Sequence, residues 1–228
     1  MMESLGRNLF RMGCVAACLA FAQPAAAESD WDAARHVRTD WVFASLKESD
    51  VRPTLDRTLK DQVRWAGLPG NTPDAGAFQC TKLALPPPSD AAQAAFDAAP
   101  SSRGRDADKA YAKAASLGSW RAAARLVNSS LEDEDWEGAQ PAIAWLLAHH
   151  VPAGYNKLAD VLQAMSGYDG ETPGERMRGM IASLRWRAAR EGDPVAQMEM
   201  ADLFEKLGKN DRVTALRACA TQQNPDLK

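Results

Sequence analysis

The feature that most constrains this chain is its supply of alanine. Of 228 residues, 43 are Ala, whereas Ile occurs twice and Val ten times. Alanine has the highest intrinsic helix propensity, and β-branched residues are among those that favour strands. The composition therefore predicts an all-α fold and disfavours a sandwich or a barrel. Because methyl groups are small, alanine pairs also allow antiparallel helices to approach closely.

Residues 1–27 have the three parts of a secretory signal peptide. Arg7 and Arg11 give a positive start, an apolar run covers 12–22, and small residues lead up to Ala27. The apolar run is shorter than the roughly 20 residues that a membrane-spanning helix needs. We therefore expect cleavage after Ala27, a mature protein in the periplasm, and no transmembrane segment after removal of the signal.

A lipid anchor is the alternative to this soluble export. Val15-Ala16-Ala17-Cys18 resembles a bacterial lipobox, in which Cys18 would carry the lipid. Arg11 then leaves only a very short apolar stretch before that cysteine. Four apolar residues, 19–22, would also have no function beyond it. Soluble export is the prediction that the residues favour.

Export leaves two cysteines in the mature chain, Cys80 and Cys219. In an oxidising compartment two cysteines most simply form one disulfide, and two separate buried thiols are the alternative. A bridge between them closes a loop of about 140 residues, which stabilises by roughly 4–5 kcal/mol in the loop-entropy treatment. Neither cysteine belongs to a CxxC pair or has a histidine near it, so a metal site is not expected.

The charge balance excludes a major class of ligand. The formal charge is −3, and removal of the signal peptide, which holds Glu3, Arg7 and Arg11, makes it 25 − 29 = −4. Without a basic surplus to neutralise phosphates, nucleic-acid binding is not expected. The sequence also lacks a Gly-x-Ser-x-Gly elbow, a P-loop and a dinucleotide glycine pattern. We therefore predict no catalytic residue, no metal and no cofactor, and so not an enzyme.

The residues before the repeat region form an N-terminal helical segment and loop, 28–76. Apolar residues recur at roughly helical spacing over 28–65, with a break expected near Pro53. Glycines and prolines over 67–76 indicate a loop. Three prolines, 86–88, then give a stiff spacer before a helix over 91–99, which Ser89 or Asp90 would cap.

The remainder, 77–228, is expected to be a helical repeat domain, in which a repeated unit appears from Asp106 onward. Residues 114–122 lie 74 positions before the similar 188–196, and 147–154 is a weaker copy between them. Turns are therefore expected near 118, 150 and 192, at separations of 32 and 42. A period in this range is typical of helix-turn-helix units that stack on their neighbours. Gly118 and Gly192 should end helices in the left-handed conformation, and Ser119 and Asp193 should cap the next ones.

One unit carries a family resemblance. Residues 184–197 have an alanine pair, a Gly-Asp turn and Ala-Gln, and so resemble the Sel1-like repeat. Further segments within 77–223 are similar to a group of exported Sel1-like proteins from Gram-negative bacteria: Phe78-Gln79-Cys80, the prolines 86–88, Pro152-Ala153-Gly154-Tyr155 and Cys219-Ala220-Thr221-Gln222. The resemblance implies a short right-handed α-solenoid of three Sel1/TPR-like helix pairs. His149-His150 departs from it by replacing the usual glycine-bearing turn.

The resemblance also implies a role in binding other proteins. Proteins similar to this one are commonly immunity partners that neutralise type VI secretion effectors in the periplasm. The partner would then be a secreted antibacterial effector. Other Sel1-like proteins act as adaptors or scaffolds in cell-envelope assemblies or signalling, which is the alternative. Neither role follows from composition alone.

Two groups of residues are the candidates for contacting such a partner. The first is an acidic run followed by an aromatic residue, which could plug a basic groove: Glu132, Asp133, Glu134, Asp135 and Trp136. The second surrounds the middle turn and contains His149, His150 and Tyr155. Each group has a simpler interpretation. The acidic run can be a solvated loop, the two histidines can be polar turn residues, and Tyr155 can pack between repeat units.

Overall fold

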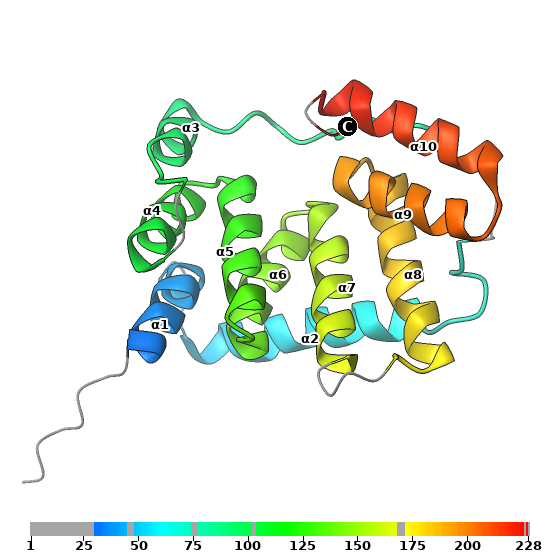
Figure 1. The fold of residues 1–228 in the computed structure, drawn as a ribbon. Helices are drawn as coiled ribbons and strands as arrows, with labels where there is room; N and C mark the ends of the chain where they lie inside the picture. Colours follow the sequence, from blue (N-terminus) through cyan, green and yellow to red (C-terminus); the bar gives the residue numbers. More distant parts are fainter. Residues whose placement is uncertain are drawn as a thin grey trace, which may run out of the picture.

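The computed structural model describes residues 30–44, 48–73, 77–101, 104–167, 172–225 and 227. The predicted signal peptide, with its cleavage point after Ala27 and the alternative lipid site Cys18, lies outside these residues. Within them all regular structure is helical, which confirms the all-α prediction (Figure 1). The helices are α1 Asp30–Phe43, α2 Glu48–Ala66, α3 Asp90–Asp97, α4 Arg105–Ser116, α5 Trp120–Glu132, α6 Trp136–Ala148, α7 Ala153–Ser166, α8 Glu175–Arg190, α9 Pro194–Lys206 and α10 Asn210–Gln223.

The first two helices correct one prediction. The break expected near Pro53 falls earlier, because α1 ends at Phe43 and α2 begins at Glu48. Pro53 therefore lies in the second turn of α2. A proline this close to the start of a helix removes only one hydrogen bond of the ladder, so the helix continues through it. The helix predicted over 91–99 forms as α3, and Ser89 caps it by accepting a hydrogen bond from the Ala92 backbone N–H.

From α4 to α10 each helix packs on the next one along the chain. α5, α7 and α9 also contact one another in sequence, whereas α4, α6 and α8 are covered by the N-terminal helices. α1 packs on α4 and α6, and α2 packs on α6 and α8. Figure 1 shows α2 lying across the row of helices formed by α5 to α8. No helix among the described residues is both long enough and apolar enough to span a bilayer.

The N-terminal helices and the later helices share one core. Trp41 and Val42 of α1, with Leu59 and Ala66 of α2, belong to the same buried cluster as the alanines and leucines of α4 to α9. Burying these side chains against α6 and α8 is what holds the N-terminal segment in place. The segments before and after the boundary at 76/77 therefore contribute side chains to one common core.

Five helix ends close in the same way. The N–H of the third residue beyond the helix donates to the carbonyl oxygen five positions earlier, at 2.8–3.0 Å: Ser119 to Ala114, Asp135 to Ser130, Val151 to Leu146, Asp193 to Ala188 and Lys209 to Phe204. This bond is the signature of the Schellman motif. The residue before each donor has a positive φ: Gly118 (96°), Glu134 (57°), His150 (55°), Gly192 (100°) and Gly208 (72°).

The recurring turn confirms part of the sequence analysis and extends it. Gly118 and Gly192 are left-handed as predicted, and Ser119 and Asp193 cap the helices that follow. His150 adopts the conformation that glycine has in the other units, so the middle turn forms without a glycine. The left-handed residues of 118, 134 and 150 lie 16 positions apart, as do those of 192 and 208.

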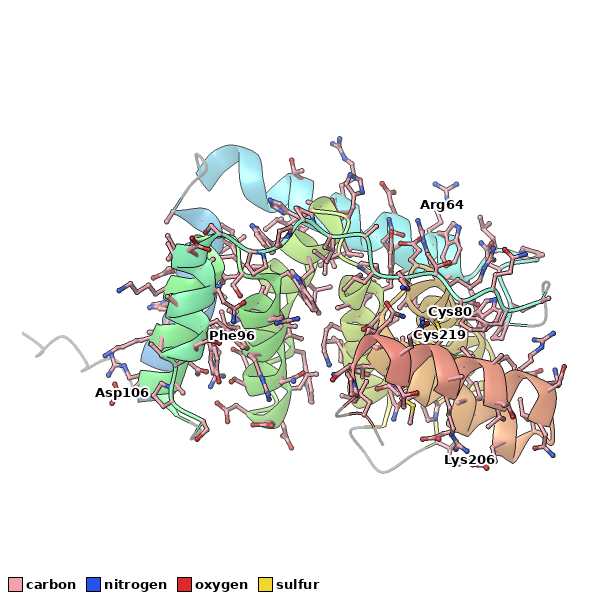
Figure 2. All side chains as sticks on the ribbon, turned by 90° about the horizontal axis from the view of Figure 1, so that it is seen from above. Arg64, Cys80, Phe96, Asp106, Lys206 and Cys219 are labelled. Carbon is pink, nitrogen blue, oxygen red and sulfur yellow. A yellow bond between two sulfur atoms is a disulfide. The ribbon has the colours of Figure 1, made fainter. Side chains whose placement is uncertain are left out.

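The disulfide joins α10 to the connection between α2 and α3. Cys80 and Cys219 are bonded, as the sequence analysis predicted, and Figure 2 shows the pair beside α10. Gln223 holds the same connection, because its amide oxygen accepts from Leu83 N at 2.7 Å and its nitrogen donates to Thr81 O at 3.3 Å. We call residues 77–89 the strap, since they cross the molecule without regular structure and are tied to α10 at these points.

The glutamine of the Ala-Gln pair has a buried role beneath the strap. Gln197 is fully buried, and its amide nitrogen donates to Ala189 O at 3.0 Å. Its amide oxygen accepts from Gln223 at 3.2 Å. This chain of hydrogen bonds links the end of α8, α9 and α10, and through Gln223 the strap, so both glutamines act as structural residues.

Candidate functional site

The predicted acidic run forms the tight turn between α5 and α6. Glu132 is the last residue of α5, and Asp135 caps α6 by accepting a hydrogen bond from Gly138 N at 2.8 Å. The side chain of Asp135 is buried, with 3% of its surface exposed. Asp135 therefore stabilises the start of α6, and it is not available to a partner.

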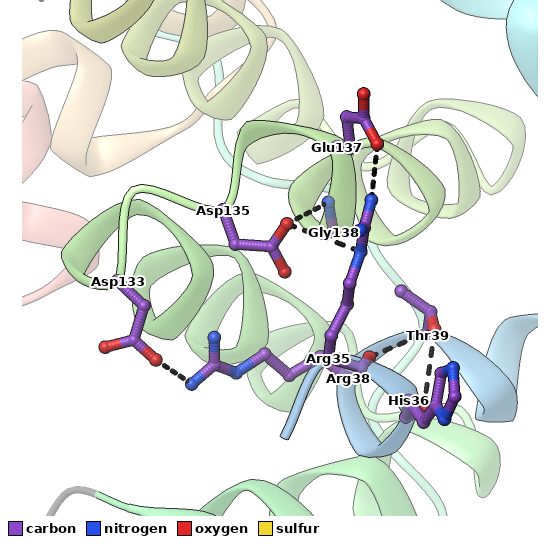
Figure 3. A network of polar contacts seen from close by, with 8 residues as sticks. All are labelled: Arg35, His36, Arg38, Thr39, Asp133, Asp135, Glu137 and Gly138. Carbon is purple, nitrogen blue, oxygen red and sulfur yellow. Dashed lines mark hydrogen bonds and ion pairs between the residues drawn. The ribbon is translucent and has the colours of Figure 1, made fainter. Parts of the chain in front are cut away.

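Two arginines of α1 reach this turn, and Figure 3 shows their contacts with Asp133, Asp135 and Glu137. Arg38 donates through Nε to Asp108 at 2.7 Å and through a terminal nitrogen to Asp133. Arg35 lies 3.5 Å from Asp135 and pairs with Glu137. Because 70 to 102 positions separate these partners in the sequence, no local pattern revealed the pairing.

Burial makes the Arg38 contacts matter. The side chains of Arg38 and Asp108 are 5% and 1% exposed. Burial alone would lower the pKa of Arg38, but its hydrogen bonds to Asp133 and Asp108 and the negative charge of both carboxylates together raise the pKa. The guanidinium therefore stays charged, and removing either carboxylate would leave a buried charge without full compensation.

The outer side of the turn remains accessible. Glu132, Glu134 and Glu137 are exposed, and Trp136 is half-buried against the core. We call these three glutamates the acidic edge. The turn and its surroundings hold six carboxylates, those of 108, 132–135 and 137, against the two guanidinium groups of α1. The acidic edge is therefore negatively charged even with α1 in place.

The second group of predicted residues divides between surface and core. His149 is exposed and stacks on Trp145 with ring centroids 4.0 Å apart, and His150 is the exposed left-handed turn residue. Tyr155 is buried, with the Arg187 guanidinium 4.2 Å from its ring centroid. This position matches the packing interpretation of Tyr155. Among the described residues, no group of three or more His, Cys, Asp or Glu could hold a metal ion.

A polar cluster that the sequence analysis missed joins α7, α8 and α9. Asp160 accepts from Lys157 and from Arg185, each at 2.9 Å, and Arg185 lies 3.1 Å from Glu199. Burial raises the pKa of Glu199, and Asp160 raises it further. Asn156, which is 1% exposed, lies beside Glu199 in this cluster. These contacts connect three helices, so we assign the cluster to stability.

Comparisons with known protein families, curated proteins and solved structures gave no match for this chain. The Sel1-like resemblance therefore rests on the residues quoted in the sequence analysis.

Proposed function

We propose that this chain is an exported, non-enzymatic binding protein that neutralises a type VI secretion effector in the periplasm. In this proposal residues 77–228 form a short right-handed α-solenoid of the Sel1-like class. The stepwise packing of α4 to α10, the recurring Schellman turn and the disulfide support it. The signal-like sequence of residues 1–27 supports export.

The observation that carries the proposal is the acidic edge. The same turn already binds two arginines of α1, so its chemistry suits guanidinium groups. Glu132, Glu134 and Glu137 extend that negative surface to solvent. A basic groove on an effector would be attracted to it over several ångströms, and like-charged proteins would be repelled. Inhibition would follow because the bound chain covers the effector's own site.

The structure decides which substitutions can test this proposal. Asp133 and Asp135 hold α1 and cap α6, so their reversal would disturb the fold as well as binding. Glu132→Lys with Glu134→Lys leaves those contacts intact. A matched control is Asp61→Lys with Asp211→Lys, which makes the same change of charge at exposed positions on α2 and α10.

The experiment is capture of partners from the periplasm of the native host with the tagged full chain after mild cross-linking. We expect to capture one effector in an amount equal to that of the tagged chain. Capture should be lost with Glu132→Lys/Glu134→Lys and retained with the control pair. Capture of envelope-assembly proteins in its place would favour the adaptor alternative. An effector that binds the acidic-edge variant as well as the unchanged chain would refute occlusion by this surface.

A further inference from the structure

A groove of about 560 Å³ lies between α2 and α7, beside the start of α8. α2 packs on α6 and α8, and the groove runs over α7 between those two contacts. Its walls are largely aliphatic and include Val63, Leu162 and Met180. Leu68 and Met165, which also line it, are each 50% exposed. Apolar side chains gathered in a concave place mark a binding surface more strongly than scattered ones do.

The charged side chains that the structure describes at this groove all have one sign. Among the described residues, Lys60, Arg64 and Arg176 line it and no carboxylate does. Within the described part of the chain none of these three cations forms an ion pair, in contrast to Arg35, Arg38, Arg185 and Arg217. Figure 2 shows Arg64 projecting from α2 away from the body of the molecule. In a chain whose formal charge is −3, a rim of cations alone fits an anionic ligand.

The shape of the groove suits a helix. Its α2 wall extends from Leu59 to Arg64, about 8 Å at 1.5 Å per residue, and is continued by Gly67 and Leu68 just beyond the helix. Its α7 wall extends over two turns from Leu158 to Met165. Lys60 and Arg64 are four positions apart, so their side chains are spaced roughly 6 Å along the groove. That spacing matches acidic side chains that recur along a helix, whereas a single lipid phosphate requires donors that converge on one point.

We propose that the groove between α2 and α7 is a docking site for an acidic amphipathic helix of a partner protein. The apolar stripe of that helix lies on Val63, Leu162 and Met165. Its flanking carboxylates pair with Lys60, Arg64 and Arg176. This is the helix-in-groove mode of recognition. The inference is independent of the function proposed above, because it concerns a different surface of opposite charge.

The test uses two synthetic helical peptides of about 15 residues, long enough to hold several turns. Both carry leucines at helical spacing; one has glutamates beside the stripe and the other has lysines. Fluorescence anisotropy with the full chain measures their dissociation constants at low and high salt. We expect the glutamate peptide to bind at least about tenfold more tightly at low salt, with the difference shrinking as salt screens the charges.

Variants of the groove make the test specific. The double variant Lys60→Glu/Arg64→Glu should bind the lysine peptide more tightly than the glutamate peptide, which reverses the order of the two affinities. The control Arg57→Glu/Arg125→Glu, at exposed positions outside the groove, should leave that order unchanged. Met165→Glu should weaken the glutamate peptide without unfolding the protein, because this side chain is half exposed. Equal binding of the two peptides, or an order that survives Lys60→Glu/Arg64→Glu, would overturn the proposal. So would binding to phosphatidylglycerol vesicles with none to the glutamate peptide.

Discussion

Replacing Gly192 with alanine should destabilise the protein more than the same replacement at Gly118. Both glycines end helices with nearly the same positive φ, 100° and 96°. They differ in what a side chain would meet. A Cβ at Gly192 would lie 2.8 Å from Leu83 N and 2.9 Å from Thr81 O, both backbone atoms of the strap. At Gly118 nothing lies within 4 Å.

The magnitude of the difference follows from this geometry. An alanine in the left-handed region costs roughly 1–2 kcal/mol, and that cost applies to both variants. The reduced freedom of the unfolded chain is also common to both, so it cancels in the comparison. Only Gly192→Ala adds steric overlap, for which about 1–3 kcal/mol is typical of tightly packed sites. The strap cannot easily retreat, because Gln223 and the disulfide hold it.

The assay is urea unfolding followed by circular dichroism, with both variants measured under oxidising conditions. Gly192→Ala should lose about 1–3 kcal/mol more than Gly118→Ala, equivalent to a further fall in Tm of at least about 2 °C for a chain of this size. Releasing the strap with Cys80→Ser and Cys219→Ser should narrow that difference, which a double-mutant cycle measures. Equal losses at the two glycines would refute the reasoning.

Three further predictions concern single features of the fold. Burial raises the pKa of the Asp193 carboxyl group from 3.8 to about 6. The folded state therefore binds the carboxyl proton more tightly than the unfolded state does, and the free energy of unfolding should fall as pH rises from about 4 to 6. Asp193→Asn keeps the capping oxygen but has no charge to bury, so its free energy of unfolding at pH 7 should be about 2–3 kcal/mol higher. Unfolding curves with the same pH dependence in both proteins would contradict this. His150→Gly replaces a left-handed histidine with the residue that adopts this conformation without strain, so it should stabilise the protein by about 0.5–1 kcal/mol in thermal unfolding. An unchanged stability would contradict this. Loss of the disulfide in Cys80→Ser/Cys219→Ser should cost roughly 4–5 kcal/mol in urea unfolding, and a cost below about 1 kcal/mol would contradict the closure of so long a loop.

The sequence predicted the features that depend on local chemistry. Alanine abundance gave the helical class, Gly118 and Gly192 gave two of the turns, and the two mature cysteines gave the disulfide. It missed the turn at Glu134, and it placed a turn near 150 without predicting that His150 is left-handed; neither residue is a glycine. The free-energy cost of a left-handed residue other than glycine is small compared with the stabilisation from packing the two helices that it joins. Tertiary contacts therefore decide the conformation of such a residue.

The surfaces were harder to predict, because they depend on residues distant in the sequence. The acidic run looked like four equivalent carboxylates until α1 placed Arg38 on Asp133, 95 positions away. Lys60 of α2 and Met165 of α7 line the same groove, and neither residue stands out in its own segment. Gln223 likewise acquires its role only when α10 lies under the strap.

The most direct test of the proposed function is a titration of the captured effector's activity with the purified chain. We expect the effector's activity to fall to its baseline near one equivalent of the unchanged protein. Inhibition should persist with Asp61→Lys/Asp211→Lys and be lost with Glu132→Lys/Glu134→Lys. An effector that stays fully active when saturated with the unchanged chain would contradict neutralisation by occlusion.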